Sequence, residues 1–197
     1  MLLPTVCAPC SRLHMRNCGG RPRHDRSRAS STRSLAQQQQ YTVERSPAED
    51  AAIRSRTAFH LAIPTHSLDA ARRFYGDVLG LPQGRSSARW LDYNFYGHQL
   101  VCHVVDGYQG RTATNAVDGD PVPVPHFGLA LTVEDFHALV SRLTSKGVQF
   151  ELEPHIRFVG APGEQWCAFC RDESGNAIEF KAMSTPSNLF AQYNVTH

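Results

Sequence analysis

Long apolar runs are missing from this sequence of 197 residues. A membrane-spanning helix needs about 18 or more consecutive apolar residues, and no stretch approaches that length, so no membrane association is expected. Glycine and proline are also few, at 14 and 12 residues, which excludes collagen-like and low-complexity chains. We therefore expect one ordinary globular domain accompanied by a tail.

A net positive charge is lacking outside the N-terminal part of the chain. Residues 1–46 contain eight Arg, no Lys and only two acidic residues, Asp25 and Glu44, which gives this segment a net charge of +6. Because the whole chain has a net charge of +2, the remaining residues carry −4. Nucleic-acid binding needs a basic face on the folded part, so no nucleic-acid partner is expected.

Residues 1–46 also lack a sustained hydrophobic period, and they are rich in Arg and Ser. This acid-poor composition is typical of an organellar transit peptide, and the apolar stretch 1–6 is too short for a secretory signal. We expect residues 1–46 to be a disordered transit peptide that is cleaved off, with the chloroplast favoured over the mitochondrion as the destination. The alternative is a disordered extension with no targeting role.

The six cysteines include two CxxC strings, one beginning at Cys7 and the other at Cys167. This spacing can bind zinc or form a redox pair. The second string lies in an expected strand, where side chains three positions apart point to opposite faces. We therefore expect Cys167 and Cys170 to be buried separately and not to share a metal.

Two similar halves follow from residue 57, each with the order strand, helix, three strands. The first half predicts a strand over 57–64, a helix over 67–79 between Ser67 as N-cap and Gly80, and strands near Arg85 and over 90–96 and 99–105, with a turn at Gly97–His98. The second half predicts strands over 126–133, 148–152, 165–170 and 177–181 and a helix over 134–146. A shift of 66 residues places His60 on His126. These halves are two βαβββ modules, 57–105 and 126–182, joined by a linker over 106–125 and followed by a loose tail, 183–197.

Four strings carry a family resemblance: FHLAI at 59–63, ARRFYGDVLGL at 71–81, PHFGLAL at 125–131 and DESGNAIEF at 172–180. Over residues 57–182 the chain resembles the vicinal oxygen chelate superfamily, which includes glyoxalase I, bleomycin-resistance proteins and extradiol dioxygenases. The extradiol-dioxygenase-like branch is the most similar. The resemblance implies an α+β fold in which two βαβββ modules form a half-open barrel around a metal cleft, and it implies a homodimer.

Strand alternation tests the metal site that the resemblance implies. His60, His126 and Glu179 lie on three different strands, each between apolar neighbours that face the other way. Two His and one carboxylate on one face form the facial triad associated with non-haem Fe(II). We therefore expect these three side chains to hold a divalent metal, with Fe(II) favoured and with Mn, Ni, Zn or Co suited to the same ligands.

Five further polar residues are weaker candidates. His103 is interpreted as the counterpart of the second module's Glu, and therefore as a possible fourth ligand or acid/base. Asp92 and Asn94 share one strand face, from which they could contact substrate. His155 and Arg157 are expected in the loop before the strand over 165–170, where an acid/base or a carboxylate clamp could lie.

The leading functional hypothesis is a metal-dependent dioxygenase that resembles extradiol ring-cleaving enzymes and acts on a small vicinal-diol or enediol-type substrate chelated to the metal. The runner-up is a glyoxalase I-like lyase or isomerase. That family commonly supplies a second Glu from its fourth strand, where this sequence has Cys102 and His103. A third hypothesis is a non-catalytic small-molecule binding module, against which the triad argues. A homodimer is expected, and the sequence leaves open whether the site lies within one chain or is shared between two.

Overall fold

The structure is a computed structural model, and it describes residues 57–193 of the chain. The expectations for residues 1–46, and those for the last four residues of the tail, lie outside this range. Within it, no helix is long and apolar enough to cross a membrane.

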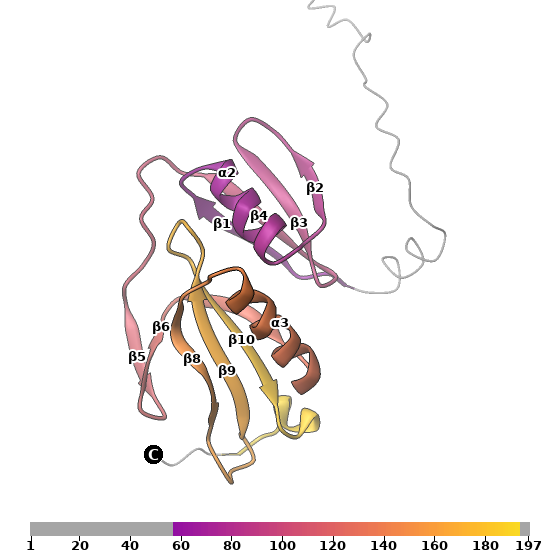
Figure 1. Cartoon of the computed structure of the whole chain (residues 1–197), viewed down its shortest axis with the longest axis vertical. Helices are drawn as coiled ribbons and strands as arrows, with labels where there is room; N and C mark the ends of the chain where they lie inside the picture. The colour runs from indigo at the N-terminus through magenta and orange to yellow at the C-terminus, as the bar shows by residue number, and fades with distance from the viewer. Residues whose placement is uncertain (1–56, 194–197) are drawn as a thin grey trace, which may run out of the picture. The chain divides into compact units, whose positions relative to one another are not determined.

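Each half of the described chain contains one helical segment and four strands (Figure 1). The first module consists of β1 (His60–Thr65), α2 (Leu68–Ala71), the π-helical segment η1 (Arg72–Val78), β2 (Gln83–Ser86), β3 (Trp90–Phe95) and β4 (His98–Val104). The second consists of β7 (His126–Ala130), α3 (Val133–Ser145), β8 (Phe150–Arg157), β9 (Gln165–Arg171) and β10 (Ala177–Met183). The repeat is therefore confirmed.

The two four-stranded sheets have the same topology. Their strand orders are β1-β4-β3-β2 and β7-β10-β9-β8. In each sheet the first and last strands of the module pair in parallel, and the remaining pairs are antiparallel. This confirms an α+β fold of two βαβββ modules. Both sheets are open, and no closed barrel occurs within residues 57–193.

The first helix begins and ends where the sequence predicts. Ser67 accepts a hydrogen bond from the backbone N–H of Ala70 at 3.1 Å, which makes it the N-cap. Gly80 follows the helix with a φ of +73°, a conformation that favours glycine. The second half of the helix is wider than an α-helix, because Leu79 donates to the carbonyl of Phe74, five residues earlier.

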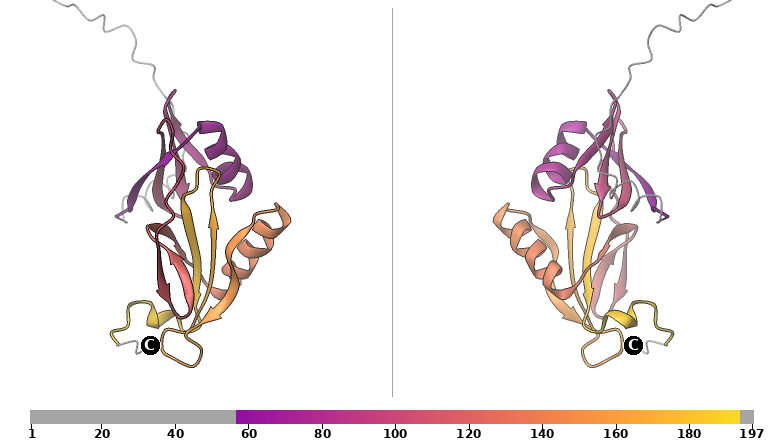
Figure 2. Two further views of the ribbon diagram at one scale, coloured as in Figure 1. Left: turned by 90° about the vertical axis from the view of Figure 1, so that its left-hand side faces the viewer. Right: turned by 90° about the vertical axis from the view of Figure 1, so that its right-hand side faces the viewer.

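One hydrophobic core connects the helices with the helix-facing sides of both sheets. Tyr75 from η1 and Phe136 from α3 are fully buried in it. The two modules meet within this core, where the rings of Phe95 and Phe127 lie 6.0 Å apart. Both helices lie on the same side of their sheets (Figure 2). We call the opposite side of each sheet its open face.

The expected linker contains an unforeseen hairpin, β5 (Thr114–Val117) and β6 (Asp120–Pro123). Its two-residue turn is Asp118-Gly119, and both residues have positive φ, at +51° and +87°. An Asp-Gly pair suits this turn because both positions need left-handed backbone. The hairpin lies on the side of the second sheet opposite to α3 (Figure 2). It therefore covers part of the second module's open face.

Three boundaries differ from the sequence-based expectations. β8 continues to Arg157, so His155 and Arg157 lie in a strand and not in a loop. The turn between β3 and β4 is Tyr96-Gly97, one residue earlier than expected, with φ values of +53° and +88°. Within the tail, 186–190 forms a short 3₁₀ helix, η2 (Pro186–Phe190).

Candidate functional site

The alternation of the strands confirms which side chains face away from the helices. Ile63, Ile178 and Phe180 are buried in the shared core, on the helix-facing side of their sheets. Their neighbours in alternation include His60 and Glu179, which therefore lie on the open faces. The expected burial of the two cysteines is also confirmed, since Cys167 and Cys170 are both buried.

His126 and Glu179 meet on the open face of the second sheet. Their strands pair in parallel, with Ala177 opposite His126 and Glu179 opposite Gly128. This register brings His126 Nε2 to 3.3 Å from Glu179 Oε2. Gly128 permits the close approach of the strands, because a Cβ atom there would collide with the backbone carbonyl of Glu179.

The hairpin orients the His126 ring. His126 Nδ1 lies 2.6 Å from the backbone carbonyl of Pro123 on β6, which can only accept a hydrogen bond. Nδ1 must therefore carry the proton, and Nε2 faces Glu179. A histidine that donates through one ring nitrogen to a carbonyl, with the other nitrogen beside a carboxylate, has the arrangement of a metal ligand.

The electrostatics of this pair favour an ionised carboxylate. Burial raises the pKa of Glu179, but the hydrogen bond from His126 and the charge of Lys181 together hold that pKa below its usual value. The hydrogen bond to Glu179 raises the pKa of His126. The pair therefore offers one nitrogen and one anionic oxygen donor, a set that suits a divalent cation.

His60 lies on the open face of the first sheet and is exposed to solvent. Its Nδ1 is 2.7 Å from Gln99 Oε1, and Gln99 Nε2 donates to Asp92 at 2.9 Å. Since the amide oxygen can only accept, His60 donates through Nδ1 and leaves Nε2 free. Asp92 thus positions the histidine indirectly, through the amide of Gln99, rather than standing as an isolated acid.

One chain does not assemble the whole predicted triad. Between residues 57 and 193, a single group of three His, Cys, Asp or Glu side chains has its ligand atoms within 4.8 Å of one another. That group contains none of His60, His126 and Glu179. The structure therefore brings together two of the three predicted ligands, and it places the third on the other module.

The register corrects the interpretation of His103 as the counterpart of Glu179. Glu179 lies opposite Gly128, and the matching position in the first module is Val101, opposite Ala62. His103 lies two residues farther along β4. It is separated from Gln99, the partner of His60, by four strand positions, or about 13 Å. That distance argues against His103 as a fourth ligand beside His60.

The remaining predicted residues have structural partners. Asp92 is buried and accepts from the guanidinium of Arg85 at 3.0 Å. Asn94 Oδ1 accepts from the backbone N–H of Gly97 at 2.7 Å, which stabilises the hairpin turn. Asn94 therefore contributes to the turn, and Asp92 to the support of His60.

His155 and Arg157 contact a residue that sequence reasoning missed. His155 Nε2 lies 2.9 Å from Asp120 Oδ2, and Arg157 Nε lies 3.4 Å from the same oxygen. Asp120 is the first residue of β6, so its position depends on the hairpin. The Asp118-Gly119 pair was the signal that could have found it, because Asp-Gly is among the strongest hairpin motifs.

A cavity of about 270 Å³ adjoins His126. It lies between the free edges of β1 and β7, and His126 forms part of its wall. Tyr108 and Arg111 from the segment before the hairpin, and residues 175–177 at the start of β10, complete the wall. This cavity is large enough for a small molecule beside a candidate metal ligand.

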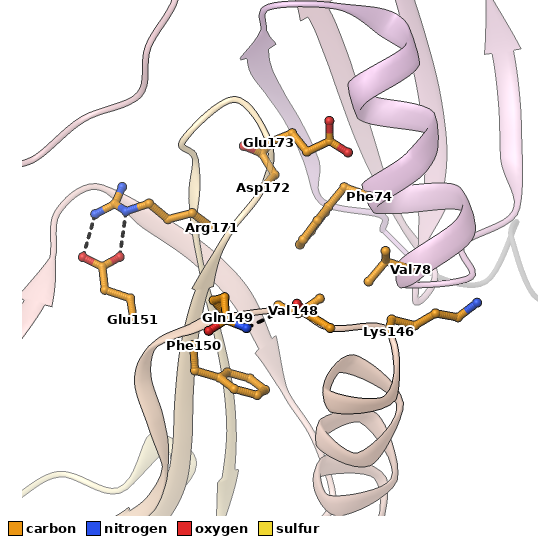
Figure 3. A pocket seen from close by; sticks show the side chains of 11 residues that line it. Phe74, Val78, Lys146, Val148, Gln149, Phe150, Glu151, Arg171, Asp172 and Glu173 are labelled. Carbon is orange, nitrogen blue, oxygen red and sulfur yellow. Dashed lines mark hydrogen bonds and ion pairs between the residues drawn. The ribbon is translucent and has the colours of Figure 1, made fainter.

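A larger hollow, of about 520 Å³, lies elsewhere, between η1 and the start of β8 (Figure 3). Phe74 and Val78 point into it from η1, and the Arg171–Glu151 ion pair, at 2.7 Å, lies on its far side. None of the predicted metal ligands lines it. Because the predicted ligands lie on the open faces of the sheets and not in this hollow, the candidate site is on the open faces.

Comparison with known proteins settles the family. The sequence profile of the Glyoxalase/Bleomycin resistance protein/Dioxygenase superfamily matches residues 57–180. The chain belongs to this superfamily. Membership confirms the family expected from the four sequence strings, and the match covers both βαβββ modules of the superfamily domain.

Solved structures of this superfamily share the fold. A glyoxalase/bleomycin resistance protein/dioxygenase from Alicyclobacillus acidocaldarius is 29% identical, with a TM-score of 0.60, over 68% of this chain and 97% of that one. A mutant of the fosfomycin resistance protein FosX from Listeria monocytogenes, complexed with Mn(II) and 1S,2S-dihydroxypropylphosphonic acid, is 16% identical, with a TM-score of 0.51, over 69% and 96%. No curated protein matches the chain.

Proposed function

We propose that this member of the superfamily is a divalent-metal-dependent enzyme of the extradiol dioxygenase type, acting on a small substrate that chelates the metal through vicinal oxygens. The observation that carries the proposal is the pair of His126 Nε2 and the buried Glu179 carboxylate, 3.3 Å apart, with the ring anchored through Nδ1. The Mn(II) and vicinal dihydroxy compound in the FosX complex support the substrate class.

The donor set fits a metal. His60 and His126 each donate through Nδ1 to a carbonyl oxygen, so each presents Nε2, and Glu179 provides an anionic oxygen. Two imidazoles and one carboxylate leave coordination positions without a protein ligand, as Fe(II) oxygenases require. When bound, the metal would act as a Lewis acid that holds the vicinal oxygens of the substrate.

Val101 favours the dioxygenase over the glyoxalase-type lyase. It occupies the position on β4 that matches Glu179 on β10, where a glyoxalase commonly supplies its second Glu. An apolar side chain there cannot bind a metal or move a proton. His103 is exposed on the same open face and is the candidate for proton transfer, but four strand positions separate it from Gln99, so it would act on a part of the substrate away from the metal or through a water.

The site is completed by a second copy of the chain. Among residues 57–193, His60 is not within ligand distance of the His126–Glu179 pair, and both described helices lie on the side of the sheets away from the open faces, where only the β5–β6 hairpin covers part of the second sheet (Figure 2). Two copies that face each other with their open faces would combine the first module of one with the second module of the other. The protein is then a homodimer with two shared sites.

The test of metal binding is elemental analysis of the full chain, purified anaerobically, beside His126→Ala. About one equivalent of iron per chain, lost in the variant, is expected. Oxygen uptake with catechol-type compounds, measured with an oxygen electrode, then tests the reaction. Turnover of a hemithioacetal without oxygen uptake would transfer the assignment to the lyase, and absence of metal after reconstitution would leave a binding module.

Complementation tests the shared site. His60→Ala and Glu179→Ala each remove one ligand, so each variant alone should be inactive. Mixing and refolding the two variants together allows one intact site to form in a mixed dimer, and activity should return. No recovery in the mixture, with both variants shown to fold by circular dichroism, would contradict sharing.

A further inference from the structure

A second group of metal-ligating side chains lies on the second module, apart from the His126–Glu179 pair. Asp120 on β6, His155 on β8 and Cys167 on β9 have ligand atoms that all lie within 4.8 Å of one another. His155 and Cys167 are direct neighbours across the β8–β9 pair, and the hairpin brings Asp120 over them. Three elements therefore converge on one point.

A neutral His155 ring cannot satisfy both of its hydrogen-bond partners by itself. Its Nδ1 lies 2.6 Å from the backbone carbonyl of Glu153, and its Nε2 lies 2.9 Å from the Asp120 carboxylate. Both partners are acceptors, whereas a neutral imidazole has one proton to donate. A metal bound between Nε2 and the carboxylate satisfies both contacts of a neutral ring, with Nδ1 donating to the carbonyl.

Arg157 provides a second, independent observation. Its side chain is only 4% exposed, and its Nε is the one buried side-chain N or O atom in the described part of the chain that lacks a hydrogen-bond partner. Burial raises the pKa of the Cys167 thiol to about 11, and the adjacent Arg157 acts in the opposite direction. A Cys167 thiolate would give the orphaned Nε–H an acceptor, and a metal that displaces the thiol proton creates that thiolate.

We propose that Asp120, His155 and Cys167 form a binding site for a borderline-soft divalent metal such as zinc, separate from the site shared by His60, His126 and Glu179. The three donor types, carboxylate oxygen, imidazole nitrogen and thiolate sulfur, are those that zinc takes. Tetrahedral zinc needs separations between ligand atoms of about 3.3–3.7 Å, which small side-chain rotations within this group can reach.

The charges and the access route are consistent with a bound cation. An ionised Asp120 and a Cys167 thiolate carry two negative charges, against the single positive charge of Arg157. His155 is 39% exposed, so an ion can reach the group from solvent and keep one water as a fourth ligand. The bound metal would fasten the β5–β6 hairpin to β8 and β9 through Asp120.

Cobalt substitution tests this site without using enzymatic activity. Co²⁺ bound by a thiolate shows a sulfur-to-cobalt charge-transfer band in the near ultraviolet, whereas a site made only of His and carboxylate ligands shows none. The full chain is used with Cys7, Cys10 and Cys18 replaced by serine, which leaves three cysteines, and it is reduced before titration with Co²⁺ alone. We expect the band at one equivalent of the sulfur-bound ion, and its loss on adding Zn²⁺.

Matched variants assign the band. Cys167→Ser and His155→Ala should abolish the band or weaken cobalt binding at least tenfold. Cys170→Ser removes an equally buried thiol on the opposite face of the same strand, and His126→Ala disables the other proposed site, so both should keep the band. His155→Ala keeps the test decisive if Cys167→Ser fails to fold, since His155 is partly exposed.

Two results would overturn the proposal. One is a wild-type titration that shows no sulfur band at saturating Co²⁺. The other is a band that survives Cys167→Ser or disappears in Cys170→Ser. Because the shared site contains no sulfur, failure here leaves the dioxygenase proposal untouched, and failure of iron binding at the shared site leaves this one untouched.

Discussion

The two modules share one topology but differ in how their open faces are supported. In the first module, His60 is exposed, and the buried Asp92 pairs with Arg85, whose side chain is 74% exposed. In the second module the hairpin covers part of the open face, and Asp120 pairs with Arg157, whose side chain is 4% exposed. Each ion pair therefore joins a nearly buried group to a more exposed one, but the buried member is the carboxylate in the first module and the guanidinium in the second.

This difference shows that the repeat duplicates the scaffold and not the environment of its polar side chains. The strands and helices recur because both modules need the same alternation to bury one face. The support of the second open face comes from the connecting segment, through the Pro123 carbonyl and the Asp120 carboxylate. The same kind of ion pair should therefore contribute differently to the free energy of unfolding in the two modules.

The largest expected effect is that of Asp120→Ala in the metal-free protein. This change leaves the Arg157 guanidinium buried without its carboxylate, which should reduce the free energy of unfolding by about 2–3 kcal/mol. The matched change Asp92→Ala leaves a solvated Arg85 and should cost about 1 kcal/mol. Urea denaturation with a chelator present measures the free energy of unfolding of both variants. Equal losses would contradict the proposed difference between the two modules.

The next effect depends on pH. The raised pKa of His126 contributes stability that is complete below the unfolded value of 6.5 and is lost as pH rises through the folded value. The lowered pKa of Glu179 contributes stability above 4.5, which is lost as pH falls through the folded value. Glu179→Gln should therefore cost most between pH 4.5 and 6.5, about 1–2 kcal/mol in metal-free protein. A cost that grows steadily above pH 7 would contradict this assignment.

Smaller effects are expected from the two hairpin turns. Gly97 and Gly119 both have strongly positive φ, and an added Cβ would meet no atom within 4 Å at either position. The substitutions then add only backbone strain, so Gly97→Ala and Gly119→Ala should each lower the free energy of unfolding by about 1 kcal/mol. Thermal unfolding of both variants checks this. A much larger cost at Gly119 would show that the second hairpin's position depends on the detailed shape of its turn.

The smallest effect on stability is expected from His60→Ala. The His60 side chain is exposed and has one hydrogen bond, to Gln99, so its loss should change the free energy of unfolding by less than about 0.5 kcal/mol. The same variant should lose the metal of the shared site, as elemental analysis would show. A variant that keeps its metal would remove His60 from the ligand set.

Local sequence patterns predicted most of the fold. Ser67 and Gly80 fixed the limits of the first helix, and alternation placed His60, His126 and Glu179 on the correct faces. These features depend on neighbouring residues alone, so one sequence suffices to see them. Alternation along a strand, however, tells which face of the sheet a side chain lies on and not how far it is from another side chain. For that reason it could not show that His60 lies apart from His126 and Glu179.

The errors in the second module have a physical cause. Pro154 interrupts the pattern of β8 and marks a loop in most sequences, but β8 is an edge strand, where a missing N–H costs nothing. The hairpin sequence around Asp118-Gly119 is short and polar, so it has no hydrophobic alternation of its own. Its two strands pair with each other, and their turn is a local signal, but the position of the hairpin over the second sheet depends on contacts with β8, which local patterns do not show.

The parallel pairing of β7 with β10 also has a consequence for the order of events during synthesis. His126 opens the second module and Glu179 lies in its last strand, so the two donors meet only after every intervening element has been made and the long-range pairing has closed. Contacts between distant parts of the chain form late in folding. A chain truncated before β10 would lack Glu179 and so the donor pair, and binding of the proposed metal would therefore report that the entire module has folded.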